Sequence, residues 1–204
     1  MVTSAFWILL AVFIYGLVHS ILASLGVKAH ARQWLGPAAD RWYRLGYNIF
    51  GAITLLPVLA LPAILPDQPL YTIPAPWVYL ALAGQVAAVV MLAVSVMQTG
   101  AWSFLGLKQA FFSGNESPHR LVQTGLYRWM RHPIYSAGLI FIWLMPVMTV
   151  NLLTLNVGLT IYFIIGAMFE ERKLVREFGE EYLQYRKVTP MLIPRPPRKT
   201  ILET

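Results

Sequence analysis

The chain has 204 residues, of which 57% are hydrophobic and only 12% are charged, and its formal net charge is +7. Soluble domains carry about 25% charged residues, so this composition favours an integral membrane protein over a soluble one. The absence of cysteine excludes disulfides, Cys-ligated zinc and Cys-ligated iron–sulfur clusters, and the four histidines show no metal-ligand spacing, so we expect no metal site.

Apolar stretches long enough to span a bilayer begin near the start of the chain. A transmembrane helix needs roughly 20 mostly apolar residues to cross about 30 Å of hydrocarbon. Residues 5–26, 45–65 and 77–97 meet this requirement and place three spans within residues 1–97. The first stretch has no basic residue before it and is too long for a signal-peptide core, so we expect a retained span.

Two further apolar stretches lie in the second half of the chain. Residues 134–150 and 152–169 are separated only by Asn151, which favours a tight helical hairpin. If the hairpin crosses the bilayer fully, the all-α fold has about five transmembrane helices. A hairpin that dips into the membrane and returns fits the sequence equally well.

The basic residues indicate the topology. All 16 lysines and arginines fall in three segments, at 26–44, 108–131 and 172–199. These segments follow the first span, the third span and the hairpin, whereas the connection at 66–76 contains Asp67 and no basic residue. Because basic loops stay in the cytoplasm, we expect an external N-terminus and a cytoplasmic C-terminus. The division of the basic residues among three juxtamembrane segments also argues against nucleic-acid binding.

A polar motif precedes the hairpin. The chain from residue 121 runs Leu-Val-Gln-Thr-Gly-Leu-Tyr-Arg-Trp-Met-Arg-His-Pro-Ile-Tyr. Pro133 suits the first position of a helix, where its missing N–H costs nothing. Arg131 and His132 then lie at a helix N-terminus, whose free donors and dipole bind anions. The alternative is an interfacial anchor, because Arg, Trp and Tyr often sit at membrane boundaries.

A second polar motif follows the hairpin. Glu170 and Glu171 stand where the apolar sequence ends. The helical period then puts these residues on one face: Glu171, Leu174, Phe178, Tyr182 and Tyr185. One interpretation is a cytoplasmic amphipathic helix that lies on the membrane surface. The two carboxylates favour a second interpretation, in which they are partners for an ammonium or sulfonium group.

Polar residues also occur inside the spans. His19 lies in the first span, Asn48 in the second and Gln85 in the third. Such residues either make interhelical hydrogen bonds or face a cavity. A path lined by them is typical of a small transporter or channel, which stays open as an alternative function.

The ordered set of motifs resembles the isoprenylcysteine carboxyl methyltransferase superfamily. The motifs are Gly-Leu-Tyr-Arg at 125–128, Arg-His-Pro-Ile-Tyr at 131–135, Glu-Glu at 170–171, Phe-Gly at 178–179, Tyr182 and Tyr185. The resemblance covers about residues 98–194, and the phospholipid N-methyltransferases share part of it. Phe-Leu-Gly-Leu-Lys-Gln at 104–109 and Pro-Met-Leu-Ile-Pro at 190–194 are similar to the NnrU-like and methanethiol S-methyltransferase branch.

The resemblance implies a single membrane methyltransferase domain that uses S-adenosylmethionine. Residues 98–194 would form the cofactor-binding core, followed by a tail at 195–204. The implied cofactor-binding residues are Val122, Gly125, Tyr127, His132, Tyr135, Glu170, Glu171 and Tyr182. Within this set, His132 and Tyr135 would contact the adenosyl part, and Glu171, together with Glu170, would meet the amino group.

The implied acceptor is a small or lipophilic molecule that enters from the bilayer, either a thiol or a prenylcysteine carboxylate. The implied catalytic residues are Arg131, His132 and Arg186. His132 would act as a base for a thiol, whereas Arg131 or Arg186 would bind the cofactor's carboxylate or an acidic acceptor. The alternatives are a non-enzymatic NnrU-like membrane factor and a phospholipid N-methyltransferase. The sequence indicates no particular oligomeric state.

Overall fold

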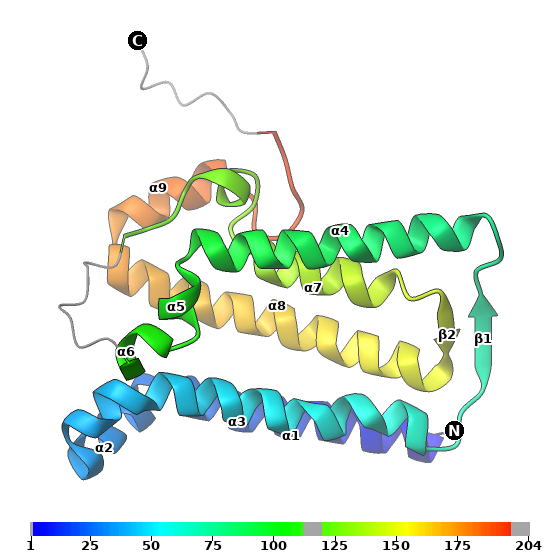
Figure 1. The fold of residues 1–204 in the computed structure, drawn as a ribbon, viewed down its shortest axis with the longest axis horizontal. Coiled ribbons are helices and arrows are strands. Elements are labelled where there is room, and N and C mark those ends of the chain that lie inside the picture. Colours follow the sequence, from blue (N-terminus) through cyan, green and yellow to red (C-terminus); the bar gives the residue numbers. More distant parts are fainter. Residues whose placement is uncertain (1, 112–119, 197–204) are drawn as a thin grey trace.

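Four of the apolar stretches form helices that are long and apolar enough to cross a membrane. The computed structural model describes residues 2–111 and 120–196. In that part of the chain the long helices are α1 (Val2–Ala23), α3 (Pro37–Ile64), α4 (Trp77–Gln98) and α8 (Val150–Phe178). They run alongside one another as a bundle (Figure 1). The prediction of an all-α, multi-pass integral membrane protein is confirmed.

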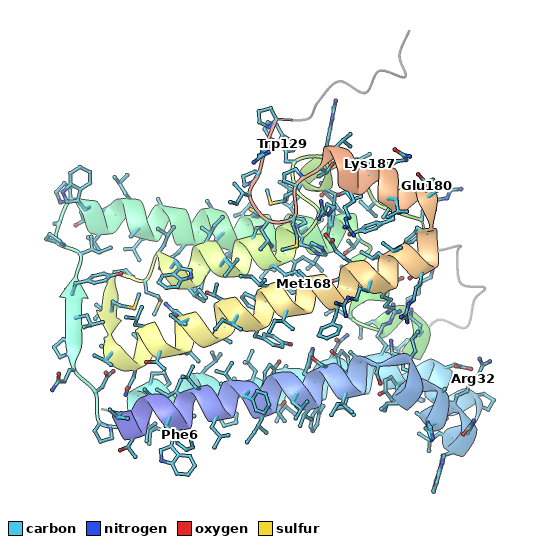
Figure 2. The ribbon with its side chains drawn as sticks, turned by 180° about the vertical axis from the view of Figure 1, so that it is seen from behind. Phe6, Arg32, Trp129, Met168, Glu180 and Lys187 are labelled. Carbon is cyan, nitrogen blue, oxygen red and sulfur yellow. The ribbon has the colours of Figure 1, made fainter. Side chains whose placement is uncertain are left out.

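Shorter elements gather at the two ends of the bundle (Figure 1). One end carries α2 (Leu25–Leu35), α5 (Ala101–Phe104), α6 (Leu107–Phe111), the 3-10 helix η1 (Gly125–Arg128) and α9 (Glu180–Val188). The opposite end carries the N-terminus and the antiparallel ribbon of β1 (Pro69–Thr72) and β2 (Val147–Thr149). Arg32 and Lys187 lie at the first end and Phe6 lies near the other (Figure 2). The side of the membrane that each end faces stays a prediction.

The fourth apolar stretch differs from the prediction. Its helix, α7 (Pro133–Trp143), has only 11 residues, and β2 follows before α8 begins. A helix of this length is about 16 Å long, roughly half of the hydrocarbon thickness. Because α7 starts beside α9 and β2 pairs with β1, extended backbone completes the passage along the bundle (Figure 1). The turn of the hairpin therefore lies at 144–149, and the predicted turn at Asn151 is wrong.

Asn151 lies in the first turn of α8, where it secures the end of α3. Its side-chain amide donates to the carbonyls of Pro62, Leu65 and Pro66 at 3.4, 3.2 and 3.2 Å. The residue is 1% exposed. Carbonyls at a helix end have no intrahelical donor, so a buried end needs such partners. The polar residue that interrupts the apolar sequence thus has a structural role.

The predicted amphipathic helix after the hairpin is divided in two. α8 continues to Phe178, and α9 starts after Gly179, whose φ is 56°. This left-handed conformation ends a helix and favours glycine. Tyr182 and Tyr185 of α9 are buried by the protein. The apolar face of α9 therefore packs against the protein, which corrects the single continuous surface helix predicted from the period.

The packed core lies between α1, α3 and α8. Ile8, Val12, Val58, Leu155 and Leu159 form one buried cluster. Many other apolar side chains on these helices point outward and are exposed. An apolar surface of this extent suits lipid contact and would be an aggregation hazard in water. The core thus joins the first two long helices to α8, which carries the Glu pair.

Candidate cofactor site

Gly125, at the start of η1, connects the polar motif to the end of α4. Its φ is 61°, and a Cβ there would lie 1.9 Å from Nε2 of Gln98. Gln98 approaches so closely because its Oε1 accepts a hydrogen bond from the N–H of Leu126 at 3.1 Å. The backbone conformation therefore favours glycine at this position, and a side chain here would displace the amide of Gln98 from Leu126.

Residues 189–192, which we call the C-terminal strap, cover the start of α7. The N–H of Arg131 donates to the carbonyl of Pro190 at 2.9 Å. The hydroxyl of Ser136 donates to the carbonyl of Leu192 at 2.7 Å. These bonds fix the backbone of the Arg-His-Pro motif at the N-terminus of α7, where Pro133 occupies the first helical position as predicted.

Glu171 of α8 is the centre of a buried ion cluster. Nε of Arg131 donates to Oε1 of Glu171 at 2.7 Å, and Nη2 of the same guanidinium forms a second contact with that oxygen. Nε2 of His132 lies 3.4 Å from Oε1, and Nη1 of Arg186 lies 3.9 Å from Oε2. The side chains of Arg131 and Glu171 are 9% and 10% exposed. Removal of one partner from such a pair leaves an uncompensated buried charge.

The remaining donors of Arg131 are directed at the end of α9. Nη1 donates to the carbonyl of Arg186 at 3.2 Å and also to the carbonyl of Thr189. Carbonyls at a helix C-terminus carry the negative end of the helix dipole, which favours a cation. The guanidinium therefore joins α7, α8 and α9. An interfacial anchor keeps its charge in water or lipid headgroups, so burial argues against that alternative for Arg131.

Glu170 has a different environment from its neighbour. Its side chain is 45% exposed. The hydroxyl of Tyr135 donates to Oε2 at 2.9 Å, and Nδ1 of His132 lies 3.8 Å from the same oxygen. Glu171 is held by two arginines, whereas Glu170 retains accessible oxygen atoms. Of the two carboxylates, Glu170 is thus the one with capacity for a ligand.

His132 lies between the two carboxylates and is 4% exposed. Burial lowers the pKa of His132 below its ordinary value, and the charges of Glu170 and Glu171 oppose that effect. The imidazole is therefore neutral at pH 7 and contributes no positive charge to the cluster.

Tyrosines of η1 and α9 lie beside the cluster. The hydroxyl of Tyr185 donates to the carbonyl of Tyr127 at 2.5 Å and joins α9 to η1. Tyr182 is 1% exposed and lies beside Arg131, yet its hydroxyl makes no hydrogen bond of normal geometry with the described residues. Burial raises the pKa of Tyr182 to about 12. A buried hydroxyl without a partner is costly, so Tyr182 has the capacity for a further contact.

A cavity of about 350 Å³ opens beside the C-terminal strap. Its charged lining residues are Arg131, Arg186, Lys187 and Arg195. Because cations surround the cavity, it attracts anions, and a carboxylate is a suitable occupant.

The structure brings together these predicted site residues: Arg131, His132, Tyr135, Glu170, Glu171 and Arg186. Tyr182 lies beside this group, and Tyr127 is bonded to α9. Val122 and Gly125 make no hydrogen bond to the group within the described part of the chain. The roles assigned to all of these residues stay predictions.

Sequence reasoning missed the backbone part of the site. The carbonyls of Thr189 and Pro190 are acceptors for Arg131, and Arg195 lines the cationic cavity. Backbone acceptors leave no mark on residue type. The motif at 190–194 marked this segment as part of the family pattern, but the sequence did not indicate that the segment packs against the start of α7.

Comparison with known proteins gives a consistent set of relatives. A methanethiol S-methyltransferase of Mycobacterium tuberculosis is 30% identical over 92% of this chain and 77% of its own length. Methanethiol S-methyltransferase 1 of Bradyrhizobium diazoefficiens is 30% identical over 91% of this chain and 65% of its own length. The human protein-S-isoprenylcysteine O-methyltransferase is 37% identical over 37% of this chain and 28% of its own length. No solved structure gives a significant match.

The family assignment rests on a family profile together with the relative from Mycobacterium tuberculosis. The profile of the phospholipid methyltransferase family matches residues 77–181. That region runs from the start of α4 into α9 and includes both polar motifs. The predicted resemblance is confirmed, and the chain belongs to the phospholipid methyltransferase family.

Proposed function

We propose that this protein is an integral membrane methyltransferase that transfers the methyl group of S-adenosylmethionine to a small or lipophilic thiol. The observation that carries the proposal is the polar cluster of Arg131, His132, Glu170 and Glu171 at one end of an apolar bundle, beside a cationic cavity. Membership of a methyltransferase family supports the same reaction class.

The charged groups of the site match those of the cofactor, which carries a carboxylate, an amino group and a sulfonium. Glu170, with accessible oxygens, suits the amino group, and Arg186, whose side chain is 51% exposed in the cationic cavity, suits the carboxylate. The unpaired hydroxyl of Tyr182 offers a further contact. Glu171 is already bonded to Arg131, so we assign it to positioning that guanidinium instead of the direct amino contact implied by the resemblance.

The chemistry asks little of the protein beyond positioning. S-Adenosylmethionine supplies, when bound, a methyl group on a sulfonium that is already a good leaving group. The residues of the chain must therefore hold the reactants in line and exclude water, and no covalent nucleophile is needed. The hydrogen bond from Tyr135 fixes the carboxylate of Glu170 for this purpose.

A thiol is the acceptor class that the relatives favour. Two relatives that each match more than nine-tenths of this chain are named methanethiol S-methyltransferases. The relative named for a prenylcysteine substrate matches only 37% of the chain. A thiol needs deprotonation, because the thiolate is the nucleophile, whereas a carboxylate needs only a cation to orient it.

We also assign to the cytoplasm the end of the bundle that carries α2, α9 and the candidate cofactor site, which we call the cofactor end. The basic segments that the structure describes lie at the end that carries α2 and α9, and basic loops stay in the cytoplasm (Figure 2). The N-terminus then lies outside. A reporter fused after residue 204 should be cytoplasmic, and an external reporter would overturn the orientation.

An acceptor panel tests the proposed function. Purified protein is incubated with methyl-labelled S-adenosylmethionine and, separately, an alkane thiol, a prenylcysteine and phosphatidylethanolamine. We expect label in the thioether. If label appears only in the prenylcysteine ester or only in the lipid, the proposed thiol acceptor is wrong and the methyltransferase assignment stands. No label in any product, together with no binding of S-adenosylhomocysteine, would contradict the methyltransferase assignment.

A further inference from the structure

A cluster of aromatic rings surrounds His19, near the cofactor end of α1. His19 lies four residues before the end of that helix at Ala23. Its ring centroid is 4.6 Å from that of Tyr47, 5.5 Å from that of Tyr15 and 6.3 Å from that of Tyr162. Aromatic rings from three helices, α1, α3 and α8, therefore surround His19, which is a polar side chain within an apolar bundle.

Two glycines make room for these rings. A Cβ on Gly51 would lie 3.0 Å from Cε1 of His19, and a Cβ on Gly16 would lie 2.9 Å from Cδ2 of Tyr162. Glycine inside a helix costs roughly 0.5–1 kcal/mol relative to alanine. Close ring packing offsets that cost at both positions, so the cluster is a built feature of the bundle.

The hydrogen bonding of His19 is incomplete. Nε2 forms a close contact with the hydroxyl of Tyr47. Nδ1 is buried and has no hydrogen-bond partner among the described residues. An ionisable side chain in a membrane protein ordinarily faces a partner or a cavity. Nδ1 therefore retains unused hydrogen-bonding capacity.

An apolar cavity of about 390 Å³ adjoins His19 between α1 and α3. Its lining includes Tyr15 and His19, and also Ile14 and Phe50, which are 50% and 43% exposed on the outer face of the helices. In a bilayer this outer face contacts lipid. A lipophilic molecule can therefore reach the imidazole from the membrane without crossing water.

The opposite side of the cluster leads to the cofactor site. The ring of Tyr162 is 5.9 Å from that of Phe163, and Phe163 is 5.8 Å from Tyr135. Tyr135 donates to Glu170. His19 thus stands between an apolar entrance and the carboxylate proposed to hold the cofactor.

We propose that His19, held by Tyr47, is the base that takes the proton of the thiol acceptor, and that the cavity between α1 and α3 admits this acceptor. The inference rests on the proposed function and deepens it. In place of His132, which is enclosed by Arg131 and the two carboxylates, it assigns the base to a residue of the first helix.

The step balances with neutral imidazole as the base. Nε2–H donates to the oxygen of Tyr47, and the bare Nδ1 accepts the proton as the S–H bond breaks. The thiolate sulfur then forms a bond to the methyl carbon while the methyl–sulfonium bond breaks, which yields a thioether and S-adenosylhomocysteine. The imidazolium later returns its proton to solvent. The titratable groups that face His19 in the described chain are Tyr15, Tyr47 and Tyr162. Glu170 lies farther away, beyond Phe163 and Tyr135.

The decisive variant is His19→Gln, with His30→Gln as its matched control. His30 lies on α2 and is exposed, and its Nδ1 lies 3.0 Å from the local carbonyl of Gly26. Each purified variant is assayed with an alkane thiol and with an acidic aryl thiol that is already ionised at pH 7. Binding of S-adenosylhomocysteine is measured in the same preparation. A general base contributes typically 10²–10⁴-fold to rate.

We expect His19→Gln to bind S-adenosylhomocysteine as the parent protein does. It should lose about 100-fold or more of alkane-thiol methylation at pH 7, regain rate as the pH rises, and methylate the aryl thiol at nearly the parental rate. An unchanged alkane-thiol rate would overturn the inference, as would an equal loss with both thiols. Loss of cofactor binding would identify His19 as a structural residue.

A second pair of variants tests the same claim without removing the imidazole. Gly51→Ala places a methyl group against the ring of His19, whereas Gly46→Ala, on the same helix, meets nothing within 4 Å. We expect the first variant alone to slow alkane-thiol methylation, with the aryl thiol spared. Equal rates for the two variants would contradict the role of His19.

The parent protein separates failure of this inference from failure of the proposed function. If it binds S-adenosylhomocysteine but methylates no thiol, the role of His19 as a thiol base is wrong and the methyltransferase assignment stands. If it binds no cofactor, the proposed function itself is wrong.

Discussion

The clusters around Glu171 and His19 lie at the same end of the bundle but differ in how completely they are bonded. Glu171 is held by Arg131, and the other donors of that guanidinium reach carbonyls at the end of α9. His19 has one polar contact and one free ring nitrogen, and its other neighbours are aromatic. The first cluster is saturated, whereas the second has unused hydrogen-bonding capacity.

The difference separates groups that hold the fold from groups that can handle a ligand. A saturated buried ion pair resists change, because the loss of either partner leaves a charge without compensation. Groups with unused hydrogen-bonding capacity can bind a ligand without first breaking a hydrogen bond or ion pair inside the protein. By this criterion we propose that Glu171 and Arg131 position the site, and that Glu170, Tyr182 and His19 contact the ligands.

The largest expected effect comes from breaking the saturated cluster. Arg131→Ala should lower the free energy of unfolding by about 3–5 kcal/mol, because Glu171 remains buried and charged. Arg32→Ala is the matched control, since Arg32 pairs with Asp40 at 3.2 Å with both side chains more than half exposed. An exposed pair contributes about 0–1 kcal/mol. Equal thermal midpoints in detergent for the two variants would contradict the structural role of Arg131.

The second prediction concerns the carboxylate with unused capacity. Glu170→Gln should weaken binding of S-adenosylhomocysteine by roughly tenfold or more, since a charge-assisted hydrogen bond contributes about 1.5–3 kcal/mol. Its thermal midpoint should change little. Glu171→Gln should mainly lower the thermal midpoint, and any loss of affinity for S-adenosylhomocysteine should follow from the lost stability. Titration calorimetry of both variants, with the exposed Glu180→Gln as control, checks the distinction, and an unaltered affinity in Glu170→Gln would remove that residue from the site.

A smaller effect is expected where the polar motif meets α4. Gly125 and Gly179 both have left-handed φ, so alanine is strained at either position. Only at Gly125 does the new Cβ also meet Gln98, which bonds the N–H of Leu126. Gly125→Ala should therefore be more destabilising than Gly179→Ala by about 1 kcal/mol, the net value of that hydrogen bond. Indistinguishable thermal midpoints for the two variants would mean that the side chain of Gln98 can move aside without a loss of stability.

The smallest expected effect is a dependence of stability on pH through His132. The pKa of His132 is lower in the folded protein than its ordinary value of 6.5, so the unfolded chain binds the proton more readily. Stability should therefore fall as the pH decreases through 6.5, and part of this fall should be absent in His132→Asn. The comparison is made by thermal unfolding of both proteins between pH 5 and 8. Parallel curves would show that His132 does not contribute.

Much of the fold could be predicted from hydropathy, because a span is a local property of about 20 consecutive residues. The three N-terminal spans and the start of α7 at Pro133 lie close to their predicted positions. The hairpin turn could not be placed in this way. Residues 144–149 are nearly as apolar as their neighbours, and the pairing of β2 with β1 decides their conformation.

The site residues were predicted from motifs, but their pairing was not. Arg131 and Glu171 are 40 positions apart, and no periodicity relates them. The resemblance implies that Glu171 meets the cofactor, and this role stays a prediction. Its bond to Arg131 could not be predicted from the sequence. The contact between His19 and Tyr47 likewise depends on how α1 and α3 pack, including the space left by Gly51.

The decisive measurement for the cofactor site is a structure of the protein bound to S-adenosylhomocysteine. We expect density for the ligand between the start of α7 and α8. Its amino group should lie at Glu170, its carboxylate in the cationic cavity, and its sulfur should be directed toward the His19 cluster. Density elsewhere, or a ligand whose amino group does not contact Glu170, would contradict this assignment.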